Sequence, residues 1–202
     1  MKKKVSFLLL ITLMVIFLAS CGEDKNDSSY DETTISVDKN GVITETIVSA
    51  FNKDYYSIDE LTNEFNATIT KYNASVDDNE AAVLKEITQK DGNVYVNLVF
   101  KDKDAYKEVQ NEDFFFGTIG QAYDNGYRMD VTLKGVANGD KIERVQIMGM
   151  SDKHIIIFSE PCKIKTFRPI TYVSANVELL GDKLARSSSE SGSGLCYIIL
   201  DK

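Results

Sequence analysis

Residues 82–101 read Ala-Val-Leu-Lys-Glu-Ile-Thr-Gln-Lys-Asp-Gly-Asn-Val-Tyr-Val-Asn-Leu-Val-Phe-Lys and indicate the fold most directly. Two strand-like runs flank Asp91-Gly92, a pair that readily adopts the positive φ angles of a tight hairpin turn. Every second residue of the later run is apolar, so these side chains share one face of a strand: Val94, Val96, Leu98 and Phe100. The stretch therefore predicts an antiparallel β-hairpin with one buried face.

The segment before this hairpin predicts an amphipathic helix over about residues 57–73. Ser57 and Glu60 have the spacing of a capping box, in which the serine accepts a backbone amide and the glutamate reaches back. Apolar residues then recur at helical spacing, and we expect this face to pack on a sheet: Ile58, Leu61, Phe65, Ile69 and Tyr72. Further upstream, Asn40-Gly41 separates two alternating runs and predicts another hairpin over residues 35–48.

The segment after residue 101 predicts a short helix, a mixed region and a β-rich final third. The helix is expected over residues 102–110. Residues 114–131 are expected to form a strand, a helical turn ended by Asn125-Gly126, and another strand. Five further strands are expected over residues 154–159, 162–167, 170–180, 183–187 and 195–200, with a flexible loop over 187–194. The predicted fold class is α+β, with antiparallel hairpins packed on one main amphipathic helix.

The N-terminus has the three-part layout of a secretory signal. Lysines at positions 2–4 precede an apolar run over residues 5–19, which is too short for a membrane span of about 20 residues. Small residues and Cys21 follow. The segment Leu18-Ala19-Ser20-Cys21 resembles the lipobox of bacterial lipoproteins.

That resemblance implies that residues 1–20 are removed and that Cys21 carries a diacylglyceryl group. The chain would then be held at the outer face of the cell membrane by its lipid, outside the cytoplasm. The alternative is an ordinary secretory signal in which Cys21 is incidental. Residues 21–34 are polar and predict a flexible acidic tether, and residues 35–202 predict a single extracytoplasmic domain.

The charge of the chain argues against a nucleic-acid partner. The formal net charge is −8, and removal of the three N-terminal lysines would make the mature chain three charges more negative. Binding to phosphates, or to anionic lipid through basic side chains, needs clustered Lys and Arg. Membrane attachment is therefore expected to rest on Cys21 alone.

With Cys21 assigned to lipid, Cys162 and Cys196 remain as one pair in an exported domain. They are candidates for a disulfide. The alternative is two buried free thiols that pack as small apolar groups.

The region after residue 113 carries a second resemblance. The segments Phe114-Phe-Phe-Gly-Thr-Ile-Gly-Gln-Ala-Tyr-Asp-Asn-Gly-Tyr-Arg-Met-Asp-Val131 and Ile170-Thr-Tyr-Val-Ser-Ala-Asn-Val177 are similar to a set of uncharacterised exported lipoproteins of Gram-positive anaerobes. This resemblance supplies no catalytic residue, ligand or cofactor to carry over.

No constellation of residues in the sequence dictates a reaction. His154 is the one histidine, so neither a two-histidine metal site nor an HExxH helix can be built, and no Gly-x-Ser-x-Gly elbow accompanies it. No metal and no cofactor are expected. Paired carboxylates could hydrolyse glycosidic bonds, but acid pairs arise by chance among 31 acids, and the chain has no Trp to stack on sugars.

The aromatic residues of the 114–127 region are candidates for a binding patch, chiefly Phe115, Tyr123 and Tyr127. Successive strand residues point to opposite faces, so Phe115 should differ in direction from its neighbours. The alternative is that these rings fill the core.

Three hypotheses follow for function. The first is a non-catalytic binding or structural module of the envelope, with an unknown protein or small-molecule partner. The others are an envelope hydrolase with paired carboxylates and an accessory subunit of a transport or secretion system. An enzyme should show two carboxylates of raised pKa in a cleft, and a solute binder a deep pocket with converging polar groups.

Overall fold

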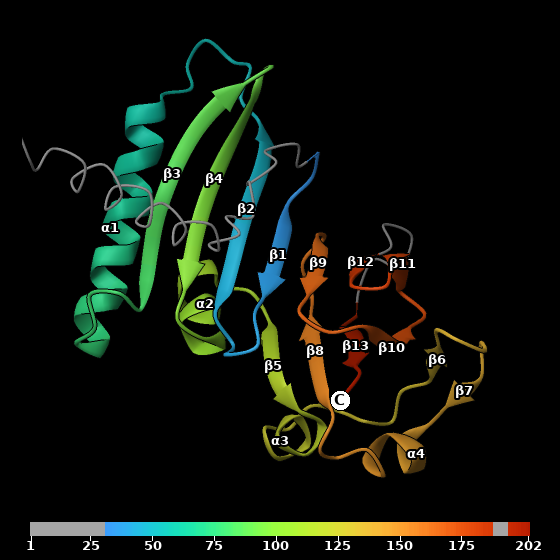
Figure 1. Cartoon of the computed structure of the whole chain (residues 1–202). Helices are drawn as coiled ribbons and strands as arrows, with labels where there is room; N and C mark the ends of the chain where they lie inside the picture. The colour runs from blue at the N-terminus through green and yellow to red at the C-terminus, as the bar shows by residue number, and fades with distance from the viewer. Residues whose placement is uncertain (1–30, 188–193) are drawn as a thin grey trace, which may run out of the picture.

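Over residues 31–187 and 194–202, which the computed structural model describes, the chain forms two β-sheets and four helices (Figure 1). The predicted α+β class is confirmed, including the β-rich C-terminal third. The predicted signal peptide, Cys21 and most of the predicted tether lie outside the described residues, as does the greater part of the 187–194 loop. In the described part of the chain, no helix is long and apolar enough to cross a membrane.

The seven-stranded sheet has the order β11-β12-β9-β1-β2-β4-β3. Its strands are β1 (Thr34–Val37), β2 (Ile43–Ala50), β3 (Ala82–Lys90), β4 (Asn93–Phe100), β9 (Lys163–Thr166), β11 (Val177–Gly181) and β12 (Leu184–Ser187). Both predicted hairpins are confirmed, β1 with β2 and β3 with β4, each antiparallel. Their turns use positive φ angles at Gly41 (85°) and at Asp91 and Gly92 (53° and 79°), as the turn residues predicted.

The six-stranded sheet has the order β5-β8-β13-β10-β6-β7. Its strands are β5 (Phe114–Thr118), β6 (Leu133–Gly135), β7 (Lys141–Ile142), β8 (His154–Phe158), β10 (Ile170–Ser174) and β13 (Cys196–Leu200). One face packs against the seven-stranded sheet in a first core, and the other contributes to a second core with residues of α3 (Ile119–Asp124) and α4 (Arg144–Met148). Because β8 and β13 are covered on both faces, their sequences are continuous apolar runs.

The main helix α1 (Ile58–Val76) packs on β3 through its predicted apolar stripe. The Ser57 hydroxyl accepts a hydrogen bond from the backbone amide of Glu60 at 3.2 Å. The reciprocal bond of a capping box, in which the Glu60 carboxylate would accept from the Ser57 amide, is not formed in the described structure. The helix continues past the predicted end at Asn73. The Asn73 side chain is buried and exchanges two hydrogen bonds with the backbone of Ala82, both 2.9 Å, so it fastens α1 to the start of β3 instead of ending the helix.

Two expectations for strands were wrong. Residues 127–132 do not form a strand; Met129 in this segment is buried, and pairing begins only at Leu133. The expected strand over residues 170–180 is two strands, β10 and β11, which belong to different sheets. The turn between them is held by Asn176, which donates to the carbonyls of Gly194 and Leu195 at 3.3 and 3.2 Å.

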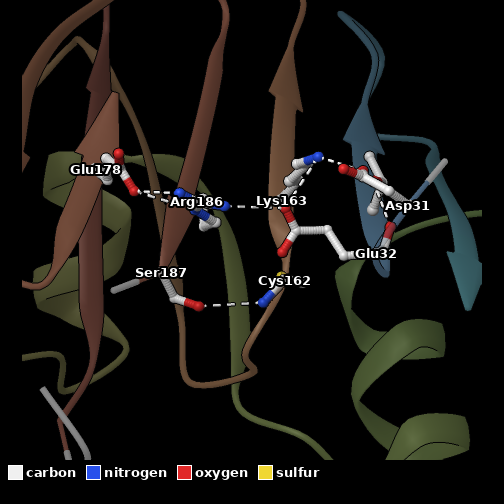
Figure 2. Close-up of polar contacts among 8 residues, drawn as sticks. Asp31, Glu32, Cys162, Lys163, Glu178, Arg186 and Ser187 are labelled. Carbon is white, nitrogen blue, oxygen red and sulfur yellow. Dashed lines mark hydrogen bonds and ion pairs between the residues drawn. The ribbon is translucent and has the colours of Figure 1, made fainter. Parts of the chain in front are cut away.

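The N-terminal hairpins are joined to the C-terminal strands by one parallel ladder, between β1 and β9, among the described strands. Ion pairs reinforce this junction (Figure 2). Lys163 contacts Asp31 at 2.5 Å and Glu32 at 2.9 Å, while Arg186 contacts Glu32 at 3.4 Å and Glu178 at 2.6 Å. Asp31 and Glu32, which lie inside the segment that was predicted to be a tether, are therefore in contact with the folded domain.

Candidate functional site

A cavity of about 460 Å³ lies beside α2 (Lys103–Gln110), at the end of β4 that is remote from the Asp91-Gly92 turn. It is assembled from α2, β5, the loop after α3 and the start of β13. Its lining comprises aromatic side chains and charged side chains of both signs: Lys103, Asp104, Lys107, Asp113, Phe114, Phe115, Asn125, Gly126, Tyr127, Arg128, Leu195 and Tyr197. Volumes of this size are typical of small-molecule sites.

Two of the three predicted patch residues meet in this cavity. The rings of Phe115 and Tyr127 lie 5.1 Å apart between centroids. On β5, Phe114 points into the first core and Phe115 into the second, as strand alternation predicts. Phe114 and Phe115 are almost wholly buried, so the core-filling alternative accounts for most of their surface, whereas Tyr127 is half-buried.

The end of α3 brings Tyr127 over Phe115. Thr118 caps α3 in a capping box with Gln121, and the helix ends at Asn125 and Gly126, where Gly126 has a φ of +87°. The backbone amide of Tyr127 then donates to the carbonyl of Ala122 at 3.0 Å, which reverses the chain. A short helix with a glycine stop thus positions one wall of the cavity.

Tyr123 does not line this cavity. Its side chain is 44% exposed, and the Arg144 guanidinium of α4 lies 5.5 Å from its ring centroid and donates to its hydroxyl at 3.4 Å. The predicted patch is therefore divided between the cavity and a separate Tyr123–Arg144 pair.

Three cations and two carboxylates line the cavity, and with Asp130 beside it each cation has a carboxylate partner, so the charge of this region is balanced within an acidic chain. The Nζ of Lys103 lies 5.9 Å from the Phe115 ring centroid and is paired with Asp104 at 2.8 Å. Lys107 lies 3.8 Å from Asp113, a loose pair. Arg128 is hydrogen-bonded to Asp130, and this bond lowers the pKa of the Asp130 carboxyl to about 2.

A second arrangement of functional groups is buried between β2, α2 and the loop after β8. The Tyr106 hydroxyl lies 2.5 Å from Glu160 Oε2 and 3.5 Å from Glu45 Oε1, and Gln110 donates to Glu45 Oε2. Sequence reasoning missed this acid cluster, which comprises Glu45, Tyr106, Gln110 and Glu160. The sequence did contain an indication of it: Glu45 alternates with Ile43 and Ile47 along the strand, so all three side chains lie on the same, inward face.

Burial raises the pKa of the Glu45 carboxyl to about 8, and repulsion from Glu160 adds to this effect. Burial also raises the pKa of Glu160. A tyrosine hydroxyl has one hydrogen, which the shorter contact assigns to Glu160. A protonated Glu45 can then donate to the Tyr106 oxygen, so the cluster can hold one proton between two carboxylates.

The acid cluster meets the pKa criterion for a hydrolase but does not lie in an open cleft. Glu45 is 1% exposed and Tyr106 is fully buried. Glu45 and Glu160 do not line the cavity beside α2, and they do not line either of two other hollows of about 790 and 260 Å³. A substrate could reach Glu45 only after the core had opened.

Cys162 and Cys196 are both free thiols in this structure and are buried in the first core. They pack as small apolar groups, the alternative to the predicted disulfide, and Cys196 Sγ lies 3.5 Å from the carbonyl oxygen of Asn176. Burial, with repulsion from Glu160 and Glu45, raises the pKa of the Cys162 thiol well above its ordinary value. A thiol in such surroundings is a poor nucleophile.

His154 opens β8 and is half-buried. Its ring stacks on Phe116 at 5.3 Å between centroids, and burial lowers its pKa. Throughout residues 31–187 and 194–202, no group of three or more His, Cys, Asp or Glu side chains is placed to hold a metal ion.

Comparisons with known proteins supply no relative: no family model matches the chain, and neither a curated protein nor a solved structure matches it. The geometry of the described residues is therefore the basis for any functional assignment.

Proposed function

We propose that this chain is a non-catalytic, lipid-anchored module of the cell envelope that binds a small solute outside the cytoplasm. The observation that supports binding is the 460 Å³ cavity, which is lined by the aromatic side chains Phe115, Tyr127 and Tyr197 together with charged side chains of both signs. The lipobox-like segment that ends at Cys21 supports the anchor.

The chemistry of the lining favours a ligand that has an apolar ring and an anionic group. An aromatic lining stabilises a ring by burial and by offset stacking. Lys107 and Arg128 offer donors at the mouth, and a carboxylate is the group that such donors bind well. Because each lining cation is paired with a carboxylate, this part of an acidic protein is locally balanced in charge, which supports the approach of an anionic ligand here.

Binding can be tested by isothermal titration of the chain with a panel of aromatic carboxylates, using uncharged amides of the same ring systems as references. We expect at least one carboxylate to bind, and we expect Arg128→Ala to weaken its binding about tenfold, which corresponds to roughly 1.4 kcal/mol. Arg144→Ala, which removes an exposed arginine outside the cavity, is the matched control. Equal losses in both variants, or no binding by any compound, would contradict the proposed site.

The anchor can be tested separately with Cys21→Ala. We expect this variant to lose the mass of the acyl groups and to leave the membrane fraction, because the acyl groups on Cys21 are the expected attachment of the mature chain. An unchanged mass and an unchanged membrane fraction would mean that Cys21 is incidental.

A hydrolase is the second candidate, and the raised pKa values of Glu45 and Glu160 favour it. The burial of Glu45 and Tyr106 opposes it, since a general acid must be within hydrogen-bond reach of its substrate. Hydrolysis of envelope glycans that is abolished by Glu160→Gln in a folded protein would establish this candidate in place of the first.

A further inference from the structure

Three aromatic rings gather on the loop between β2 and α1. Phe51 and Tyr56 stack with centroids 4.9 Å apart, and Tyr55 packs edge-on against Tyr56 at 4.9 Å. Tyr55 is 76% exposed and Tyr56 41%, so both rings present apolar surface to solvent. We call Phe51, Tyr55 and Tyr56 the aromatic tip.

Backbone hydrogen bonds hold the aromatic tip in place. The amide of Phe51 donates to the carbonyl of Gly92 at 2.7 Å, and the Gln89 side chain donates to the carbonyl of Phe51 at 3.0 Å. The Phe51 ring also packs against the first core. Phe51, on which Tyr56 stacks, is therefore fixed by hydrogen bonds to the β3–β4 hairpin, and the fold holds both tyrosines in exposed positions.

The aromatic tip lies beyond the end of β2, on the side of the β1–β2 hairpin where β1 begins and away from the hairpin turn (Figure 1). Thr34 pairs with Thr46, and Thr33 Oγ1 accepts the amide of Val48, so the chain before β1 runs beside β2 toward the tip. From Thr46 to Ala50, where β2 ends at the tip, is about 13 Å. The ten residues from Cys21 to Tyr30 can extend at most about 36 Å.

We propose that the aromatic tip docks on the headgroup region of the membrane to which Cys21 is attached. The docking rests on the proposed lipid anchor, which would hold the tip within the reach of a short tether and so at high effective concentration beside the bilayer. Tyrosine suits this interface because its ring is apolar and its hydroxyl stays hydrated.

The charges on the loop and on the adjacent turn balance each other, but the start of α1 is acidic. Lys53 is offset by Asp54 on the loop, and Lys90 by Asp91 at the adjacent turn. Asp59 and Glu60 in the first turn of α1 add negative charge next to the loop, so docking has to rest on the tyrosine rings and on the short tether, against some repulsion from anionic lipid.

Docking through the tip would set the direction in which the cavity faces. The tip lies at the Asn93 end of β4, and α2 follows the Phe100 end, about 24 Å away along the strand. The cavity beside α2 would then face away from the membrane, open to solutes.

The chain contains no Trp, so Tyr55→Trp provides a single fluorescent reporter at the tip. Residues 21–202 of this variant would be coupled through Cys21 to a maleimide lipid in vesicles of phosphatidylglycerol and phosphatidylethanolamine; Cys162 and Cys196 are buried and do not compete. We expect the emission to shift to the blue and to be quenched at least twofold by lipids with brominated acyl chains. Tyr123→Trp, an exposed tyrosine on α3, is the control and should show neither effect.

Chemical coupling makes this test independent of whether cells acylate Cys21. If the wild-type chain carries no acyl group in cells but the coupled Tyr55→Trp variant still shows blue-shifted, quenched emission on vesicles, the proposed anchor is refuted and the docking chemistry stands. Identical emission from the two variants would overturn the docking. A shift of the Tyr55→Trp emission on addition of soluble peptidoglycan fragments, without any response to the bilayer, would overturn it in favour of a wall partner.

Discussion

Glu45 is a buried carboxyl group whose surroundings in the fold favour its protonated form. Its position on β2 directs the carboxyl into the first core, where Tyr106 and Gln110 surround it. The folded pKa of about 8 lies above the ordinary value of 4.5. Between these two values the folded state binds a proton that the unfolded state has lost, so this group stabilises the fold fully below about pH 4.5, and the contribution is lost as pH rises through 8.

Glu45→Gln should remove this pH dependence. The amide keeps the shape of the protonated acid and can still accept from Gln110 and donate to the Tyr106 oxygen. We expect equal free energies of unfolding for both proteins near pH 5 and a variant that is more stable than wild type by roughly 2 to 4 kcal/mol at pH 9. Urea denaturation at the two pH values measures this, with Glu108→Gln on the exposed side of α2 as the control. Parallel pH profiles for wild type and Glu45→Gln would contradict the assignment.

At the scale of elements, the parallel ladder between β1 and β9 joins the two halves of the seven-stranded sheet. The two strands of this junction have only four residues each and can form few backbone hydrogen bonds, so the ion pairs across it add to its stability. Lys163 is the centre of the network, because its side chain is only 16% exposed and contacts two carboxylates. These contacts raise the pKa of Lys163 and lower that of Asp31.

Lys163→Met should therefore destabilise the fold by about 1 kcal/mol at low salt, since the methionine keeps most of the apolar stem and loses the charge. The loss should shrink in 1 M salt, where the Debye length falls to about 3 Å. Lys202→Met is the matched control: its pair with Asp152 is on the surface, and we expect no measurable change. Thermal unfolding at low and high salt compares the two. A salt-independent loss at Lys163 would mean that packing, and not charge, is responsible.

At the scale of the whole molecule, the six-stranded sheet is shared by both cores. The first core lies between the sheets, and the second brings the outer face of the six-stranded sheet together with residues of α3 and α4. Each of β8 and β13 contributes alternate side chains to the two cores, so neither core can lose its packing without exposing the other.

The two cores should therefore unfold in one transition. Tyr72→Trp reports on the first core and Tyr172→Trp on the second, since each tyrosine packs against its own cluster. Within each single-tryptophan variant, we expect the urea transition measured by fluorescence to coincide with the transition measured by circular dichroism. Midpoints that differ between fluorescence and circular dichroism within one variant would indicate two separately unfolding units.

Local chemistry made several elements predictable. Asp91-Gly92 and Asn40-Gly41 determine where two hairpins turn, Ser57 marks the start of α1, and Asn125-Gly126 ends α3, because each of these effects acts within a few residues. The alternation of Phe114 and Phe115 likewise followed from strand geometry. Phe115 and Tyr127 were expected only as members of a cluster. Tyr123, the third member, lies outside the cavity, because nothing local shows which side of a short helix faces it.

By itself, then, the sequence determined the α+β class, the two N-terminal hairpins, the main helix and the aromatic region that contributes to the cavity. The tertiary structure alone decided that β10 and β11 enter different sheets, that β1 pairs with β9, and that Glu45 meets Tyr106 and Glu160. The physical reason is range: turn and cap preferences act between neighbours, whereas burial and pairing join residues separated by 60 or more positions, such as Tyr106 and Glu45.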